Sequence, residues 1–149
     1  MDTLNGVNTS RPPVWFMRQA GRILPSYQKL RSSYSFIDLM NNKELASKVT
    51  LMPIDDLGVD AAIIFSDILF IPESLGMDLE FTEKGPKFHN PLNPSGDKLN
   101  FSFSPEKLEH VYQNIKEVKK NSPDNIPLIG FCGGPLTTFL FMFRGNETD

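Results

Sequence analysis

Short apolar runs of strand length alternate along this chain with segments of helical periodicity, and this order constrains the fold most. Residues 13–17 (PVWFM), 59–65 (VDAAIIF) and 128–132 (LIGFC) are nearly continuous apolar runs. They lack the alternation of a strand with one solvated face, so we expect strands that are covered on both sides, as in a parallel sheet. Strands separated by helices are typical of right-handed βαβ units. The sequence therefore predicts an α/β fold.

Two segments have helical periodicity. Residues 35–58 should form a helix that ends at Gly58 and that Pro53 kinks or divides in two. A second helix should begin at Ser104, an N-cap candidate that a proline follows at the first helical position. Its apolar side chains share one face, at Leu108, Val111, Tyr112, Ile115 and Val118.

Glycine and proline mark the expected turns. Residues 79–94 should form an irregular hairpin with Gly85 and Pro86 at its turn. The glycines of residues 130–137 (GFCGGPLT) lack the spacing of a nucleotide-binding loop, so we expect them to provide tight turns. Cys132 should be a small core residue at the end of a buried strand.

Composition excludes several classes of protein. The chain has 149 residues and a formal net charge of -3, so we expect no nucleic-acid partner. Its longest apolar runs, 61–65 and 139–143, are far shorter than the roughly 20 residues of a membrane helix, and no secretory signal opens the chain. A single cysteine fits a reducing compartment. We expect one cytoplasmic domain over residues 1–149, with a flexible start at residues 1–10.

Two arginines follow the first apolar run, in the sequence RQAGR. Arg18 and Arg22 are separated by Gln19 and by two small residues, Ala20 and Gly21, which allow close approach of a ligand or of backbone. A guanidinium presents a planar fork of donors that matches a carboxylate or phosphate, so the pair could clamp an anion. The alternative, which the motif alone favours, is a pair of surface arginines or structural salt bridges.

Asp67 lies within an otherwise apolar run, AAIIFSDILFI. A carboxylate in such surroundings needs a cationic or hydrogen-bonding partner. Its place after a buried strand puts a functional role on equal terms with a structural one, because ligand sites of barrel folds form at the carboxyl ends of strands. The alternative is that Asp67 caps the next helix or pairs with an arginine of the same sheet.

Other candidates are weaker. His89 and His110 have no partner at metal-ligand spacing, so we expect no metal site. Phe139, Phe141 and Phe143 have the spacing of packing residues on a helix, and not that of a platform on which bases stack.

Read together, these motifs resemble the uroporphyrinogen decarboxylase family. The similar blocks, in the family's order and spacing, are PPVWFMRQAGRILPSY (12–27), LGVDAAIIFSDIL (57–69), IPESLGMDLEF (71–81), the pair Gly85 and Pro86, and GFCGGPLT (130–137). The similarity runs over nearly the whole chain but covers only the amino-terminal part of the family's length.

The resemblance implies a (β/α)₈ TIM barrel, of which this chain would supply the amino-terminal portion. About three βα units can be expected, which leaves the barrel incomplete and the isolated chain poorly stable, because one sheet edge is unpaired. The family converts uroporphyrinogen III to coproporphyrinogen III by removing four acetate carboxyls as CO₂, as a homodimer in haem and tetrapyrrole biosynthesis. It uses no metal and no organic cofactor.

The resemblance also assigns residues. Arg18 and Arg22 would bind substrate carboxylates, with Gln19, Ala20 and Gly21 shaping that wall of the substrate site. Asp67 matches the aspartate that binds the pyrrole N–H groups, and Asp67 and Arg18 would be catalytic. Phe141 falls where the family has a substrate-binding tyrosine, so a phenyl ring there keeps the bulk and loses the hydroxyl.

Two alternatives differ in class. The chain could be a truncated, catalytically inactive product that at most binds porphyrinogen or another subunit. It could also be a corrinoid-linked methyltransferase of the same superfamily. The sequence speaks against the second alternative, because such enzymes use clustered zinc ligands, whereas His89, His110 and Cys132 lie far apart in this chain.

Overall fold

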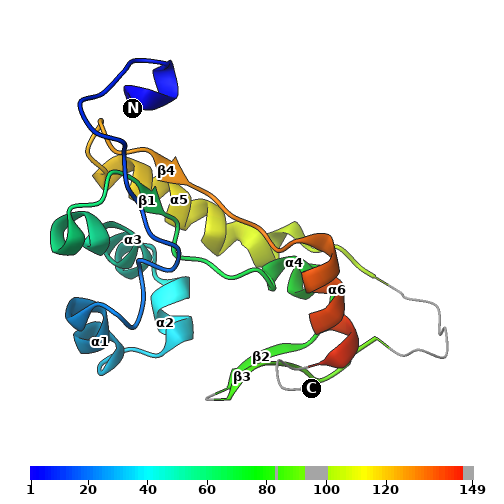
Figure 1. The fold of residues 1–149 in the computed structure, drawn as a ribbon. Helices are drawn as coiled ribbons and strands as arrows, with labels where there is room; N and C mark the ends of the chain where they lie inside the picture. Colours follow the sequence, from blue (N-terminus) through cyan, green and yellow to red (C-terminus); the bar gives the residue numbers. More distant parts are fainter. Residues whose placement is uncertain (83, 93–100, 146–149) are drawn as a thin grey trace. The chain divides into compact units, whose positions relative to one another are not determined.

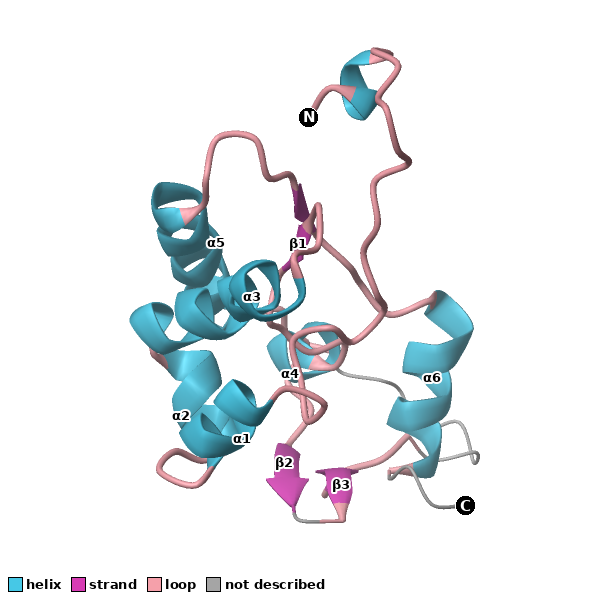
Figure 2. Ribbon diagram, turned by 60° about the vertical axis from the view of Figure 1, so that its left-hand side comes forward, coloured by secondary structure: helices cyan, strands magenta, loops and turns pink. Residues whose placement is uncertain are grey.

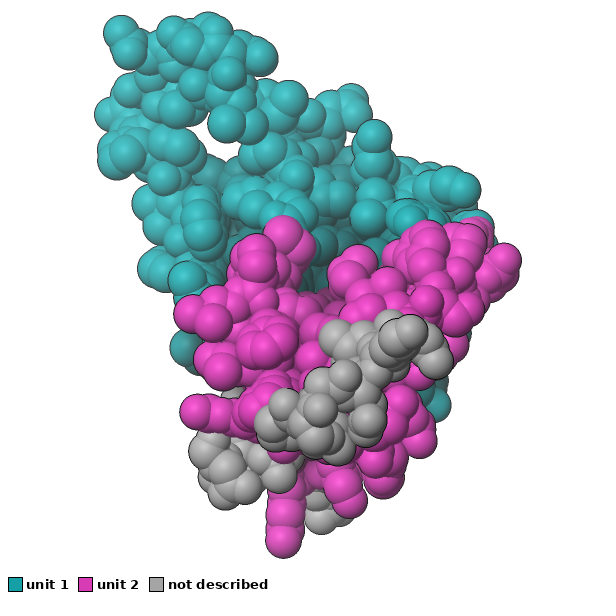
Figure 3. All heavy atoms as spheres, turned by 90° about the vertical axis from the view of Figure 1, so that its right-hand side faces the viewer, with its two compact units in different colours: residues 1–66, 110–131 teal, residues 67–109, 132–149 magenta. Residues whose placement is uncertain are grey.

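The computed structural model describes residues 1–82, 84–92 and 101–145, which form two compact units. The first unit comprises residues 1–66 and 110–131, and the second comprises residues 67–109 and 132–149 (Figure 3). Figure 1 shows the order of the elements along the chain. The single domain expected over residues 1–149 remains a prediction.

The first unit consists of helices and one pair of parallel strands. Its elements are η1 (Thr3–Asn5), α1 (Pro25–Arg31), α2 (Phe36–Asn41), α3 (Lys43–Leu57), β1 (Ala62–Ile63), β4 (Leu128–Ile129) and most of α5 (Glu109–Asn121). The helix α3 packs against β1, α1 and α2, as Figure 2 shows for β1. Its core is fully buried, at Leu39, Met40, Ala46, Val49, Ala62 and Val118.

The helix expected over residues 35–58 is divided, but the break lies at Asn42 and not at Pro53. The Asn42 side chain accepts a hydrogen bond of 3.0 Å from the Leu45 amide and thereby caps α3. An asparagine that bonds the local backbone in this way favours a helix start over a helix interior. Pro53 stays within α3, and the helix ends at Gly58 as predicted, where φ is 65°.

The strands expected at residues 59–65 and 128–132 both occur, shorter than predicted, and they pair in the parallel sense expected for the sheet. Ala62 pairs with Leu128 and Ile63 with Ile129. The amides of Ala62 and Ile64 donate to the Pro127 and Ile129 carbonyls, both at 3.0 Å, while the Phe65 amide faces the other edge and donates to the Thr50 hydroxyl at 3.0 Å. Cys132 is exposed, so its assignment to a buried strand is wrong.

The strand predicted at residues 13–17 is also absent. Trp15, Phe16 and Met17 are 47%, 55% and 81% exposed. One point of this segment is held: the Val14 amide donates to the Asp60 carboxylate at 2.7 Å, and the Asp60 amide donates to the Val14 carbonyl at 2.8 Å. A β-strand needs backbone hydrogen bonds to a neighbouring strand at successive alternate residues. In this segment, within the described part of the chain, such contacts occur at Val14 alone, and one of the two involves the Asp60 side chain.

The second unit contains an antiparallel hairpin, β2 (Leu79–Thr82) with β3 (Gly85–Phe88). The hairpin confirms the prediction for this part of the chain, but Gly85 and Pro86 belong to β3, so the turn precedes them. Residues 93–94 of the predicted hairpin lie outside the described residues. The unit is completed by α4 (Phe70–Ser74), η2 (Pro105–Leu108) and α6 (Pro135–Arg144). Its core cluster consists of Leu69, Met77, Phe88 and Met142.

The helix predicted from Ser104 begins and ends as expected, with a first turn, η2, of 3₁₀ type that α5 continues. Its buried face differs from the prediction. Tyr112 is 47% exposed, whereas Asn114 is 2% exposed and donates from its amide to the Met40 carbonyl at 2.7 Å. A polar residue can occupy this face because its donor is satisfied.

The fold is therefore a mixed α/β fold with one parallel and one antiparallel pair of strands. No closed barrel occurs among the described residues, and the loss of the strand at residues 13–17 leaves the expected three βα units unconfirmed. None of the helices within the described ranges is long and apolar enough to cross a membrane.

Candidate functional site

The two predicted anion-binding arginines lie on a tight turn of the first unit. The turn is closed at its ends, because the Gln19 amide donates to the Phe16 carbonyl at 3.1 Å. Arg18 occupies the third position of this turn with φ of 61°, and it is the one residue other than glycine with positive φ in the described part of the chain. Residues other than glycine rarely have a positive backbone φ, and arginine is not among the residue types that are enriched there. The turn therefore sets the direction of Arg18 at an energetic cost.

Gln19 ties this turn to β1. Its side chain is 1% exposed. The Oε1 atom accepts a hydrogen bond of 3.0 Å from the Phe16 amide, and Nε2 donates at 2.8 Å to the carbonyl of Ala61, the residue before β1. The arginine segment is thus anchored to the strand by a side chain that the solvent does not reach.

A second turn holds Arg22. The Leu24 amide donates to the Gly21 carbonyl at 3.0 Å, and the Gln28 side chain donates from Nε2 to the Arg22 carbonyl at 2.7 Å. A Cβ atom on Gly21 would lie 3.2 Å from the Arg18 carbonyl oxygen, so the two turns pack closely where glycine stands. Residue 21 is small for a steric reason, as the sequence suggested for a close approach of backbone.

Both guanidiniums of this segment are exposed. Neither Arg18 nor Arg22 forms an ion pair with a carboxylate of the described residues. Of the two structural alternatives, salt bridges find no support in residues 1–82, 84–92 and 101–145, whereas the exposure of both side chains agrees with surface arginines as well as with a ligand site. Two exposed positive groups on adjoining, hydrogen-bonded turns can accept an anionic ligand without first breaking an internal pair.

Asp67 belongs to the second unit and is half-buried. Its Oδ1 atom accepts a hydrogen bond of 2.8 Å from the Leu69 amide, immediately before α4. The N-cap residue of α4 is Leu69, and the helix has no side-chain cap. The Asp67 bond is a local one to the amide two residues on, so the alternative in which Asp67 caps the helix is not realised.

Phe141 lies on α6, where its ring packs against the core cluster of the second unit. Packing was the bottom-up expectation for this side chain. The phenyl ring of Phe141 therefore serves packing, and it lacks the hydroxyl that a tyrosine at this position would have.

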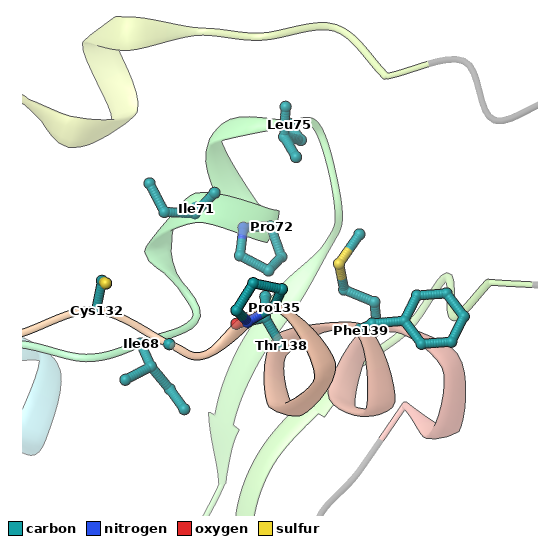
Figure 4. Close-up of a pocket in the computed structure, with 10 residues that line it drawn as sticks. Ile68, Ile71, Pro72, Leu75, Cys132, Pro135, Thr138 and Phe139 are labelled. Atoms are coloured by element: carbon teal, nitrogen blue, oxygen red, sulfur yellow. The ribbon is translucent and has the colours of Figure 1, made fainter.

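The second unit also contains a cavity of about 240 Å³ between α4 and α6 (Figure 4). Most of its lining is apolar, including Ile71 and Pro72 of α4 and Phe139 of α6, and Cys132 and Thr138 contribute polar atoms. Beside it, a Cβ atom on Gly133 would collide with the Thr138 hydroxyl. The glycine expected to provide a tight turn is needed here for space.

Comparison with known proteins decides the family. The family model described as "Uroporphyrinogen decarboxylase (URO-D)" matches residues 1–149. The chain belongs to the uroporphyrinogen decarboxylase family. A uroporphyrinogen decarboxylase of Agrobacterium fabrum is 46% identical over 151 residues, which cover 99% of this chain and 44% of the relative. One of Protochlamydia amoebophila is 48% identical over 144 residues, which cover 95% of this chain and 39% of the relative.

The chain spans less than half the length of these curated uroporphyrinogen decarboxylases. Among solved structures, a methyltransferase from Methanosarcina mazei superposes with a TM-score of 0.68 over 95% of this chain and 43% of its own. At 18% sequence identity this likeness concerns the fold alone.

The predicted site residues fall into two groups. The structure brings residues 18–22 together on one pair of turns in the first unit, whereas Asp67 and Phe141 belong to the second unit. No group of three His, Cys, Asp or Glu side chains in the described ranges could hold a metal ion.

Two residues that shape this part of the first unit carried no role in the sequence-based prediction. Gln28 bonds the Arg22 carbonyl, and Asp60 holds the chain before the arginine segment through a bidentate pair with Arg11, both contacts measuring 2.7 Å. The Arg11 hydrogen bond holds the pKa of the Asp60 carboxyl below its usual range. The position of Asp60 directly before an apolar run could have indicated a structural role for its carboxylate. No feature of the sequence around Gln28 indicated its contact with Arg22.

Proposed function

We propose that this chain provides the carboxylate-binding wall of an enzyme that converts uroporphyrinogen III to coproporphyrinogen III. The reaction removes the four acetate carboxyls as CO₂ and requires no cofactor. One observation carries the proposal: Arg18 and Arg22 extend exposed guanidiniums from turns that are fixed by buried and backbone hydrogen bonds, and neither is paired with a carboxylate in the described part of the chain.

The substrate matches this arrangement chemically. Uroporphyrinogen carries eight carboxylates, so its recognition demands guanidinium donors, and a net charge of -3 makes local cations more important than the overall field. A fixed pair of arginines binds such groups without reorganising during the reaction.

For the chemical step we assign Asp67 and Arg18 as catalytic residues. Loss of CO₂ breaks the bond between the acetate methylene and its carboxyl carbon, and the electron pair needs an acceptor. A pyrrole ring protonated on carbon is such an acceptor, and the Asp67 carboxylate would stabilise its positive charge. Arg18 would hold the departing carboxylate. A proton then adds to the methylene carbon and the ring carbon releases the proton it had taken up, so one proton is consumed for each CO₂ released.

The remaining properties follow from the family and are part of the same proposal. The substrate is a small molecule, and we assign neither nucleic acid nor membrane as a partner. The complete protein would act as a homodimer in the cytoplasm, within porphyrin biosynthesis. Its site would comprise Arg18, Ala20, Gly21, Arg22 and Asp67, and Phe141 would contribute bulk.

A hybrid enzyme tests this proposal. Residues 1–149 of this chain replace the matching part of the Agrobacterium fabrum relative, and formation of coproporphyrinogen III is measured. Since a hydrogen bond to a charged group contributes about 1.5–3 kcal/mol, Arg18→Ala should lower kcat/KM by roughly 10-fold to 150-fold. Asp67→Ala should lower kcat strongly while the fold persists.

The matched control is Arg31→Ala, because Arg31 is an exposed arginine whose NH1 group donates to the Tyr34 carbonyl at 2.6 Å, away from residues 18–22. It should leave turnover unchanged. Near-normal turnover of the Asp67 variant would overturn the assignment of that residue. If the isolated chain binds uroporphyrin but forms no product, the alternative of an inactive porphyrinogen-binding fragment holds for the chain alone.

A further inference from the structure

We propose that Gln19 is a positioning residue: it holds Arg18 in the left-handed conformation and so presents its guanidinium to a substrate carboxylate before binding. This inference rests on the proposed function of Arg18. It differs from the expectation that Gln19 itself is among the substrate-binding residues.

The burial of Gln19 and its contacts carry the argument. With 1% of its surface exposed, the side chain has no room for a ligand. Its acceptor bonds the Phe16 amide and its donor bonds the Ala61 carbonyl, so both ends of the side-chain amide serve the protein. A buried amide that is satisfied in this way fixes the backbone around it.

These contacts act directly on the turn that contains Arg18. The amide and the carbonyl of Phe16 both bond Gln19, the first through the side chain and the second through the backbone. The turn is therefore closed twice, and Arg18 lies between the two closed ends. Without the side-chain bonds, one backbone hydrogen bond of 3.1 Å would hold this turn.

The conformation of Arg18 makes such support necessary. At φ of 61° the Cβ atom of an L-residue crowds its own backbone, and glycine is the usual solution at the third position of such a turn. Strained residues persist where the surroundings over-determine them, and they occur at sites of function. Gln19 supplies that constraint, and an arginine stands there because the guanidinium is needed.

A double-mutant cycle on the hybrid enzyme described above tests the inference, with uroporphyrin I as a fluorescent octacarboxylate probe. Gln19→Met keeps the length of the side chain and removes both hydrogen bonds. In the parent background it should weaken the Kd for uroporphyrin I by about tenfold, equivalent to about 1.4 kcal/mol. In the Arg18→Ala background the same change should alter Kd by less than about twofold, because a residue that acts through Arg18 has nothing left to position.

Equal weakening in both backgrounds would show that Gln19 acts independently of Arg18 and would overturn the inference. An unchanged Kd for Gln19→Met in the parent background would overturn it as well. The proposed function fails in a different way: Arg18→Ala itself would then leave Kd unchanged.

A second variant covers the case in which Gln19→Met does not fold. Gln19→Glu keeps the acceptor for the Phe16 amide and, when its carboxyl is protonated, regains a donor for the Ala61 carbonyl. Its Kd relative to that of the parent should therefore recover as the pH falls toward the pKa of the introduced carboxyl. A ratio that does not change with pH contradicts the positioning role.

Discussion

The left-handed conformation of Arg18 makes a quantitative prediction about stability. For an L-residue this conformation costs about 1–2 kcal/mol, whereas glycine adopts it freely but loses roughly 0.5–1 kcal/mol more backbone entropy on folding. The Arg18 side chain is exposed, so its removal sacrifices no buried surface. The difference predicts that Arg18→Gly raises the free energy of unfolding by about 0–1.5 kcal/mol, while carboxylate binding is lost.

Urea denaturation can measure this change through the fluorescence of Trp15, the single tryptophan, which lies three residues before Arg18. Arg22→Gly is the matched control, because Arg22 does not have positive φ. It should lower the free energy of unfolding by about 0.5–1 kcal/mol. A loss of more than about 0.5 kcal/mol for Arg18→Gly would refute the view that strain is stored at Arg18.

Three further predictions concern the supporting structure. Asn42→Ala removes the cap of α3 and should lower the free energy of unfolding by about 1 kcal/mol in a urea titration, whereas an unchanged value would contradict the capping role. Because Arg11 lowers the pKa of Asp60, the stability from this pair is present above about pH 3.9 and is lost as pH falls through the folded pKa, so Asp60→Asn should flatten the acid limb of a stability profile. A variant with an unaltered acid limb would exclude that linkage. Gly133→Ala should destabilise the second unit through its collision with the Thr138 hydroxyl, and Thr138→Ala should restore thermal stability in the double variant; a double variant no more stable than the single one would rule out this contact.

The sequence predicted the ends of helices best, because a single glycine or proline determines where a helix ends or begins. The cap at Gly58 and the helix from Ser104 occur as expected, since glycine and proline act through their own backbone geometry. The strand at residues 13–17 failed because apolar content does not reveal which backbone groups will be available as partners. At Val14 that partner is a carboxylate from residue 60.

The candidate site shows the same limit. The sequence indicated both arginines and the small residues between them, because residue type determines what a guanidinium can bind. It did not indicate that Arg18 would adopt positive φ, or that Gln19 would bond Phe16 and Ala61. The bond from Gln19 to Ala61 spans 42 positions of sequence, which periodicity and spacing do not encode. The turn from Phe16 to Gln19 is local, but neither glycine nor asparagine marks its third position.

The central claim is that Arg18 and Arg22 bind the carboxylates of the substrate, and a crystal structure of the chain with bound uroporphyrin tests it most directly. We predict guanidinium nitrogens of both arginines about 2.7–2.9 Å from carboxylate oxygens of the ligand, with both Gln19 hydrogen bonds retained. Uroporphyrin bound elsewhere, with both guanidiniums still in solvent, would contradict the account.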